Sequence, residues 1–274
     1  MNLKKILFIT FIFVLFLVII FFVFGESLIN QGMSTEAVNV TQPMTDFEKP
    51  ASVKIPILIY HHIRKFSSND SENDRTFVVP PADFAKQMNY LKENGYQTLT
   101  FIDFKNIFAG QEKLPEKPII ITFDDGIVNQ FTKAFPILKE NNQQAVFFIF
   151  TNPISKSVNY MTWENLQEMK AYGMEIGSHG HYHSDLTKIT TTEEWEREIQ
   201  KNRELIKENL GDYPTSLAYP FGSYNESVIT YVKNNGYDFS RAITHGKIHT
   251  PDDFYKLDGY FITADFDYFK NIVN

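Results

Sequence analysis

Short apolar runs alternate along this chain with segments whose apolar residues recur every three or four positions. The runs predict buried strands, and the regularly spaced segments predict helices with one buried face. We expect strands at residues 53–60, 98–100, 119–123, 145–150, 174–177, 217–219, 239–243 and 257–262. We expect helices at residues 81–94, 102–108, 128–141, 163–172, 194–209, 226–234 and 265–273, and a mobile surface loop at residues 64–76. This alternation is typical of a parallel sheet covered by helices, either open or closed into a barrel.

Local signals mark some of the element ends. Thr191 and Glu194 have the spacing of a capping box before the helix at 194–209, and Gly211 is expected to end that helix. Pro136 is expected to kink the helix at 128–141.

The first part of the chain has a different pattern. An apolar run extends from residue 6 to residue 24, interrupted only by Thr10, and it follows Lys4 and Lys5. As a helix this run is long enough to cross about 30 Å of hydrocarbon, and the two lysines favour a cytoplasmic N-terminus. A cleaved signal peptide is the alternative, and in both cases the rest of the chain is exported. We therefore expect a signal anchor (a transmembrane helix) at residues 1–24, an extracytoplasmic linker at 25–52 and one folded domain at 53–274.

The composition narrows the chemistry that such a domain can perform. The chain has 274 residues, of which 43% are hydrophobic, enough for one sizeable core and an anchor. Its formal net charge of −7 and the lack of a basic stripe argue against nucleic acid as a partner. No residue is cysteine, which excludes a disulfide, a thiolate ligand and a cysteine nucleophile. Any metal must be bound by histidine and carboxylate side chains, and the expected nucleophile is an activated water.

Two adjacent acids are the first candidates for catalysis. Asp124 and Asp125 follow the apolar run 118–121 and precede Gly126, so they stand where a buried strand ends in a turn. Two like charges this close destabilise each other unless a cation or a proton separates their roles. We therefore expect Asp125 to bind a metal and Asp124 to act as a general base.

Histidines also follow predicted strands. His179 and His183 come after the strand at 174–177, and His61 comes after the first strand of the domain. In parallel α/β folds, ligands bind at the carboxyl ends of the strands. Two imidazoles with the carboxylate of Asp125 suit a catalytic zinc and leave positions for water and substrate. A metal-bound water would be the nucleophile of an amide or ester hydrolysis, and His61 would protonate the leaving group.

The remaining histidines are expected to lie outside the site. His62 and His181 each adjoin a candidate residue, and in an extended segment they would face the opposite way. His245 and His249 lie in a polar stretch and are expected to be exposed.

A family resemblance rests on two motifs, Thr122-Phe123-Asp124-Asp125-Gly126 and His179-x-x-x-His183. They resemble the polysaccharide deacetylases, the NodB homology domain of carbohydrate esterase family 4, and the similarity extends over residues 53–265. The resemblance implies a deformed (β/α) barrel of about seven parallel strands. It implies a divalent metal, most often Zn²⁺, with Co²⁺, Ni²⁺ or Mn²⁺ as alternatives. It also implies hydrolysis of N-acetyl groups on a glycan, with Asp124 as base and Asp125, His179 and His183 as metal ligands.

The start of the folded domain indicates one branch of this family. Residues 57–63 resemble the opening of the enzymes that deacetylate poly-N-acetylglucosamine in biofilm matrices, in which the motif order is circularly permuted. The family's usual Leu-x-His motif for the acid does not follow a predicted strand after residue 200. The resemblance therefore gives the acid role to His61.

The groove motif of this branch has a counterpart in Tyr219-Pro220-Phe221-Gly222. We expect these four residues to line the substrate and oxyanion site. Phe221 replaces the family's tyrosine, whose backbone N–H lines the oxyanion site, and a backbone donor survives that replacement.

Two family residues are absent from this chain. Ala218 stands in place of the motif arginine, which leaves open what orients Asp124, and Arg241 and Lys256 are the candidates. Gly180 stands where the family favours Ser or Thr, so a hydrogen bond to the second histidine of the loop is expected to be missing.

These features together predict a membrane-tethered hydrolase that removes N-acetyl groups from a cell-surface or secreted N-acetylglucosamine polymer, either poly-β-1,6-N-acetylglucosamine or peptidoglycan. The expected partners are that glycan and the cytoplasmic membrane, and the catalytic domain is expected to be monomeric. Two alternatives stay open: an O-acetyl esterase acting on a polysaccharide such as xylan, and a non-catalytic glycan-binding protein of the same fold. The same residues serve both hydrolases, whereas a binding protein has no need of them.

Overall fold

The computed structural model describes residues 47–274. The expected anchor at residues 1–24, and all but the last residues of the expected linker at 25–52, lie outside the described residues. Within residues 47–274, no helix is both long and apolar enough to cross a membrane.

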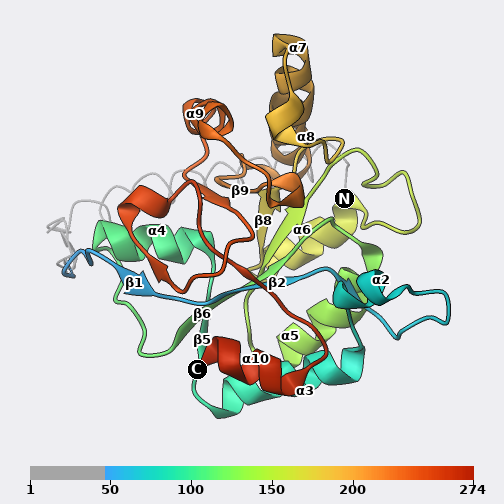
Figure 1. Ribbon diagram of the computed structural model, residues 1–274, viewed down its shortest axis with the longest axis vertical. Coiled ribbons are helices and arrows are strands. Elements are labelled where there is room, and N and C mark those ends of the chain that lie inside the picture. Colours follow the sequence, from blue (N-terminus) through green and yellow to red (C-terminus); the bar gives the residue numbers. More distant parts are fainter. Residues whose placement is uncertain (1–46) are drawn as a thin grey trace, which may run out of the picture. The chain divides into compact units, whose positions relative to one another are not determined.

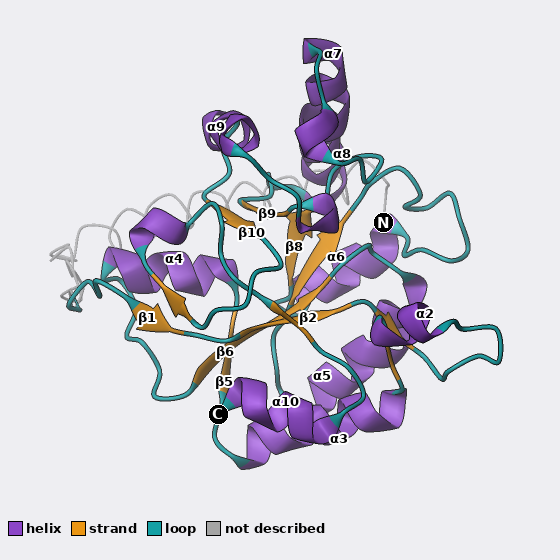
Figure 2. Ribbon diagram, in the orientation of Figure 1, coloured by secondary structure: helices purple, strands orange, loops and turns teal. Residues whose placement is uncertain are grey.

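Parallel strands form a twisted sheet in the middle of the folded domain (Figures 1 and 2). Every pair of neighbouring strands in this sheet is parallel. Among the described residues, seven strands follow one another by hydrogen bonding in the order β10 (Phe239–Arg241), β9 (Ser216–Ala218), β8 (Glu175–Ser178), β7 (Val146–Ile149), β6 (Pro118–Phe123), β2 (Ile57–Tyr60) and β12 (Tyr260–Phe261). An eighth strand, β5 (Gln97–Leu99), also pairs with β6.

The two ends of this sheet are joined by the segment that leads into β12. On one side, Leu257 N donates to Ser240 O at 2.9 Å and Ala242 N donates to Leu257 O at 2.9 Å, which pairs the segment with β10. On the other side, β12 pairs in parallel with β2. The sheet therefore curves into a half-barrel of seven parallel strands, which is consistent with the deformed barrel that the family resemblance implies.

Helices cover the outside of the barrel (Figures 1 and 2). Two of them continue directly from a π-helical turn, a turn with one extra residue: α5 follows η1, and α8 follows η3. The helices are α3 (Pro81–Glu93), α4 (Phe101–Ala109), η1 (Gln130–Ala134) with α5 (Phe135–Asn141), α6 (Trp163–Ala171), α7 (Thr192–Trp195) with η3 (Glu196–Gln200) and α8 (Lys201–Leu210), α9 (Glu226–Asn234) and α10 (Phe266–Val273).

Neighbouring residues of each strand contribute to different parts of the core. Ile120 and Phe148 join a cluster with residues of β2, β9 and β10, which faces the barrel interior. Ile121 and Phe147 point the other way and pack with residues of α3 and α5. All four side chains are fully buried. Burial on both faces explains why these strands are continuous apolar runs in the sequence.

Local signals end the elements largely as expected. Thr191 caps α7, and its side chain and that of Glu194 each bind the other's backbone N–H, so the long helix begins at Thr192. Gly211 ends α8 with a φ of +91°, a conformation that glycine adopts without strain. Pro136 stands just after the π-helical turn η1, and the chain stays helical through it from Gln130 to Asn141.

The segment 64–76 is not a loop throughout. Ser71 caps a short helix, α2 (Glu72–Thr76), through a reciprocal pair of hydrogen bonds with Asp74. The segment is flanked by β3 (His62–Ile63) and β4 (Val78–Val79), which pair with each other in parallel. Polar composition alone predicts a loop here, because α2 has no buried residue to give it a helical pattern.

The predicted strand at 53–60 is divided into two strands. Its first part, β1 (Val53–Lys54), pairs antiparallel with β11 (Ile248–His249), and β2 begins after Pro56. This pairing also overturns the prediction that His249 is exposed. The His249 side chain is buried, and its Nε2 lies 2.9 Å from the Ile55 carbonyl oxygen.

A buried acid supports the end of the barrel opposite to the strands' carboxyl ends. Glu175 accepts hydrogen bonds from the N–H groups of Phe101 at 2.8 Å and Ile102 at 3.3 Å, at the start of α4, and from Ser216 Oγ at 2.6 Å. Burial raises the pKa of Glu175 from 4.5 to about 7, although these hydrogen bonds act in the opposite direction. The folded state keeps a proton that the unfolded chain releases, so stability declines as the pH rises from 4.5 to about 7.

Glu175→Gln should remove this pH dependence, because glutamine keeps the shape of the side chain without its charge. Relative to wild type, the free energy of unfolding of the variant should increase by roughly 2–3 kcal/mol between about pH 5 and about pH 8. Urea unfolding at the two pH values measures this change. A difference between the two proteins that is the same at both pH values would contradict the prediction.

Candidate active site

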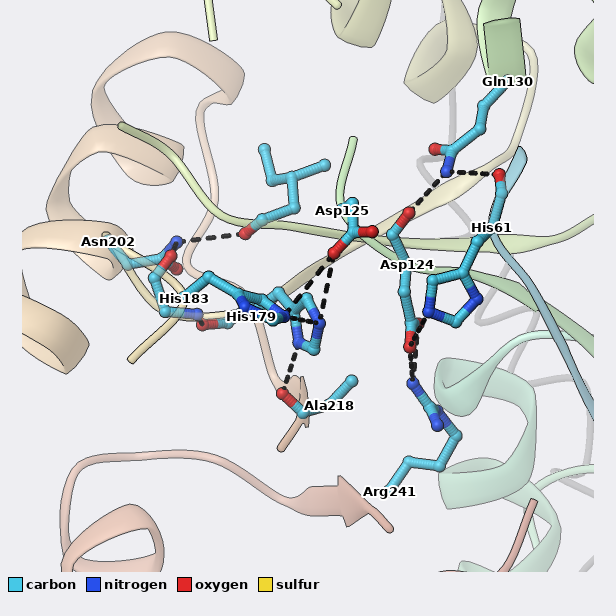
Figure 3. A network of polar contacts seen from close by, with 12 residues as sticks. His61, Asp124, Asp125, Gln130, His179, His183, Asn202, Ala218 and Arg241 are labelled. Carbon is cyan, nitrogen blue, oxygen red and sulfur yellow. Dashed lines mark hydrogen bonds and ion pairs between the residues drawn. The ribbon is translucent and has the colours of Figure 1, made fainter. Parts of the chain in front are cut away.

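A cavity opens at the carboxyl ends of the barrel strands. Its volume is about 480 Å³. Its lining residues are His61, His62, Arg64, Asp74, Phe77, Asp124, Asp125, His179, His183, Tyr219, Phe221, Ile243 and Phe261. The structure thus brings the predicted acids and histidines of the site to one place, and Figure 3 shows how they lie. Pro220 and Gly222 are not among the lining residues, although they flank Phe221.

Asp124 is held by a buried cation. Arg241, at the end of β10, places its Nη2 2.6 Å from both carboxylate oxygens of Asp124 (Figure 3). The exposed fractions of the two side chains are 1% for Arg241 and 3% for Asp124. Burial alone would raise the pKa of Asp124, but the charge of Arg241 and the nearby histidines outweigh burial and lower it. The other candidate cation, Lys256, pairs instead with Asp253, at 3.7 Å.

Asp125, His179 and His183 converge on one point. Asp125 Oδ1 lies 3.7 Å from His179 Nε2 and 3.6 Å from His183 Nε2, and the two Nε2 atoms are 3.1 Å apart. Asp125 and His183 both have a left-handed backbone, with φ values of +79° and +62°. Such backbone strain in residues other than glycine concentrates at functional sites.

The donor atoms of this cluster suit a divalent cation. His179 Nδ1 lies 2.7 Å from the Ala218 carbonyl oxygen, so Nδ1 carries the proton and Nε2 presents a lone pair to the cluster. Burial lowers the pKa of both His179 and His183 to about 4, so the rings are neutral at pH 7. Burial and the charge of Asp124 raise the pKa of Asp125 to about 7. Ionising Asp125 is costly unless a positive charge lies beside it, and the two neutral imidazoles can bind such a charge. The three side chains together therefore favour a cation between them.

His61 lies on the other side of Asp124. Its Nε2 is 3.9 Å from Asp124 Oδ2, and its ring packs against Phe77 and Phe261 at centroid distances of 5.1 and 5.3 Å. Burial lowers the pKa of His61 to about 4, although the charge of Asp124 acts in the opposite direction. The ring is therefore neutral at pH 7, and within residues 47–274 its Nδ1 has no hydrogen-bond partner.

Within the segment from Tyr219 to Gly222, most backbone N–H groups are already hydrogen-bonded or absent. Tyr219 N donates to Arg241 O at 3.1 Å, Gly222 N donates to Tyr219 O at 2.9 Å, and Pro220 has no N–H. Among the described residues, no acceptor binds the N–H of Phe221. Phe221 has a φ of +61° and an exposed ring at the cavity wall. Phe221 is therefore the residue of this segment whose backbone can bind a substrate oxygen.

Gln130 is a site residue that sequence analysis misses. It lies in η1 and is fully buried, and its Nε2 donates to the carbonyl oxygens of His61 at 3.0 Å and Asp124 at 2.5 Å (Figure 3). One amide group thus ties the end of β2 to the end of β6. No motif marks this residue, and its only signal is a polar side chain on the buried face of a predicted helix.

The loop that follows His179 is also held by residues that sequence analysis misses. Asn202 Nδ2 donates to the carbonyl oxygens of Ile149, at 3.1 Å, and Gly180. Glu198, one helical turn earlier, binds the next residues of the loop. Their signal in the sequence is two polar residues, four positions apart, on the helix face that otherwise carries apolar residues.

The other histidines have different surroundings. His62 does not face away from the site as predicted, because it lines the cavity, with its Nδ1 3.3 Å from Asn129 Nδ2. His181 is buried outside the cavity lining, with its Nδ1 2.8 Å from Thr151 Oγ1. His245 is exposed, as predicted.

The folded part of the chain is similar to known proteins. Residues 111–240 match the family model described as polysaccharide deacetylase. The chain is 32% identical over 210 residues to the Bacillus subtilis (strain 168) protein YxkH, whose name assigns it to the polysaccharide deacetylases; the match covers 77% of this chain and 71% of that protein. The chain is 27% identical over 229 residues to the poly-beta-1,6-N-acetyl-D-glucosamine N-deacetylase of Staphylococcus epidermidis, covering 76% and 78% of the two chains.

Solved structures show the same fold. A Bacillus anthracis protein, BA0330, whose name assigns it to the polysaccharide deacetylases, matches with a TM-score of 0.72 and 29% identity over 81% of this chain and 70% of that one. The Streptococcus pyogenes deacetylase PplD, solved in complex with acetate, matches with a TM-score of 0.71 and 26% identity over 78% and 94% of the two chains. Fold and site together define a barrel hydrolase. The chain belongs to the polysaccharide deacetylase family and is an enzyme of that family.

Arg241→Met should leave Asp124 buried without its cation, and this should raise the pKa of Asp124. We expect a loss of about 3–5 kcal/mol in the free energy of unfolding at neutral pH. The loss should be smaller in acid, where Asp124 is protonated in the variant. Urea unfolding at both pH values measures it, and Lys256→Met is a matched control with an expected change within about 1 kcal/mol. Equal losses at both pH values would mean that Arg241 contributes through packing alone.

Proposed function

We propose that this protein is a metal-dependent N-deacetylase of an N-acetylglucosamine polymer. The observation that carries the proposal is a single cavity in which the buried, ionised Asp124 lies between a cluster of cation-binding side chains and His61 (Figure 3). This arrangement suits the hydrolysis of an amide by an activated water. Similarity to the N-deacetylase of Staphylococcus epidermidis supports a β-1,6-linked polymer as the substrate.

The proposed metal is zinc, with Asp125, His179 and His183 as its ligands, because two imidazoles and one carboxylate are a ligand set that catalytic zinc prefers. When bound, the ion supplies a positive charge that polarises the acetyl carbonyl and makes a nearby water more acidic.

The remaining steps belong to side chains and backbone of this chain. Asp124 takes a proton from the attacking water, and the Phe221 N–H donates to the carbonyl oxygen as it becomes negative. His61 then protonates the leaving nitrogen, which departs as a free amine while the acetyl group leaves as acetate. Because His61 is neutral at rest, its proton arrives during turnover, and Asp124, with Oδ2 at 3.9 Å, is the neighbour that has just gained one.

The proposed location of this reaction is outside the cytoplasmic membrane. The apolar run before residue 25 would tether the enzyme, with the catalytic domain on the extracytoplasmic side. Removal of acetyl groups leaves primary amines on the polymer, and such amines are cationic at neutral pH. The product would therefore adhere to anionic surfaces more strongly than the substrate.

Acetate release tests the proposed reaction. A fragment that begins near residue 40 should release acetate from β-1,6-linked N-acetylglucosamine oligomers faster than from β-1,4-linked ones. A chelator should abolish release, and added zinc should restore it. Release from O-acetylated xylan alone would identify an O-acetyl esterase instead. A protein that binds zinc and releases acetate from none of these glycans would contradict the proposal.

Two variants separate the role of Asp124 from that of the cluster. Asp124→Asn should lower turnover by about a hundredfold or more while zinc stays bound, because the amide cannot accept the proton from water. His179→Ala should lose both turnover and zinc. Turnover is measured as acetate release, and zinc content by elemental analysis of the purified proteins. Full activity in Asp124→Asn would exclude this residue as the base.

A further inference from the structure

The loop between the two histidines of the cluster makes a sharp bend. It turns back at Gly180, with a φ of +80°, and ends at His183, with a φ of +62°. The positions of both imidazoles depend on this bend, because the ring of His183 reaches His179 only if the chain reverses within four residues. A residue other than glycine in a left-handed conformation costs of order 1–3 kcal/mol, so other contacts must hold the loop in this shape.

Glu198 supplies those contacts. Its Oε2 accepts hydrogen bonds from the N–H groups of His181 at 3.1 Å and Tyr182 at 3.0 Å, and its Oε1 accepts one from Ser184 Oγ at 2.7 Å. The three partners lie on both sides of His183 in the chain. The side chain of Glu198 is completely buried. A buried carboxylate costs several kcal/mol unless hydrogen bonds satisfy it, and this one is satisfied by the loop.

Gly180 fits this arrangement because it has no side chain. A Cβ atom at this position would lie 3.1 Å from Glu198 Oε2. The serine or threonine that the family resemblance leads us to expect would therefore compete with Glu198 for the same space. The family resemblance leads us to expect that a hydroxyl at position 180 supports this loop. In this chain the carboxylate of Glu198 supports it instead.

Glu198 lies in the π-helical turn η3, which belongs to the layer of helices around the barrel. Asn202, in the following α8, donates to the carbonyl oxygen of Gly180, so two residues of one helix hold the loop. π-helical turns are rare and are often found at functional sites. We propose that Glu198 is a positioning residue of the metal cluster, whose hydrogen bonds hold the loop so that His179 and His183 converge on one ion. The inference rests on the proposed function, in which these histidines bind zinc.

Two substitutions of Glu198 separate its hydrogen bonds from its charge. Glu198→Gln keeps the reach of the side chain, so its oxygen can accept from both N–H groups and its NH₂ can donate to Ser184 Oγ. Glu198→Asp keeps the charge but is one methylene shorter, so it cannot reach all three partners. We expect the Asp variant to bind zinc about tenfold or more weakly than wild type, and the Gln variant to bind within about threefold of wild type.

The measurement is the zinc dissociation constant of the purified full-length chain, obtained by competition with a chromophoric chelator. Glu196→Asp is the matched control, because Glu196 is an exposed residue of the same π-helical turn. The melting temperature of each metal-free variant is measured beside it. A merely structural role would lower that temperature without changing the dissociation constant, whereas at saturating zinc the Asp variant should recover its turnover.

Three outcomes would overturn the inference. They are an Asp variant that binds zinc as tightly as wild type, a Gln variant as weak as the Asp variant, and a control variant that is equally weak. The second would assign the effect to charge and not to the held loop. Failure of the proposed function gives different results: wild type binds zinc but releases no acetate, or His179→Ala binds zinc as wild type does. Zinc binding without acetate release would leave the role of Glu198 intact. Zinc binding by His179→Ala would exclude the metal cluster and the inference together.

Discussion

The ion pair between Arg241 and Asp124 is the interaction on which both the barrel and its chemistry depend. Asp124 follows β6, in the middle of the sheet, and Arg241 ends β10, at its edge, so the pair crosses the barrel interior. Loss of either partner would leave a charge where water is excluded, which is far more costly than the net gain from the intact pair. The same contact keeps Asp124 ionised. Stability of the fold and readiness of the site therefore rest on one hydrogen-bonded pair.

Most of the barrel could be predicted because its strands are local patterns. The run Val146–Ile149 is buried on both faces and is apolar throughout, and the helices between the strands have one apolar face. Pairing between distant segments leaves no such mark. The stretch around His249 looks like an exposed loop, yet it pairs with β1. Further along the chain, Leu257 pairs with β10 through backbone hydrogen bonds. These contacts depend on the whole topology, which a local pattern does not contain.

The candidate site likewise has residues that the sequence predicts and residues that it does not. Asp124, Asp125 and the two loop histidines could be placed together because parallel strands bring their carboxyl ends to one edge. Arg241 could be named only as one of two candidates, since its role depends on which strand lies across the barrel. Polar residues that reach the site from the surrounding helices, such as Gln130, carry no motif at all. Their contribution comes from a helix being rotated to one particular angle, and this angle is visible only in three dimensions.

The π-helical turn at η3 sets such an angle, and it has a consequence for insertions and deletions. In α8, Ile206 and Leu210 lie against the core, while Glu198 in η3 must face the loop. The extra residue of the π turn sets how Glu198 is rotated relative to these two residues. Removing one residue there would restore an α-helix and rotate one half against the other by about 100°. A single-residue deletion in η3 would therefore turn Glu198 away from the loop after His179, which it holds by hydrogen bonds.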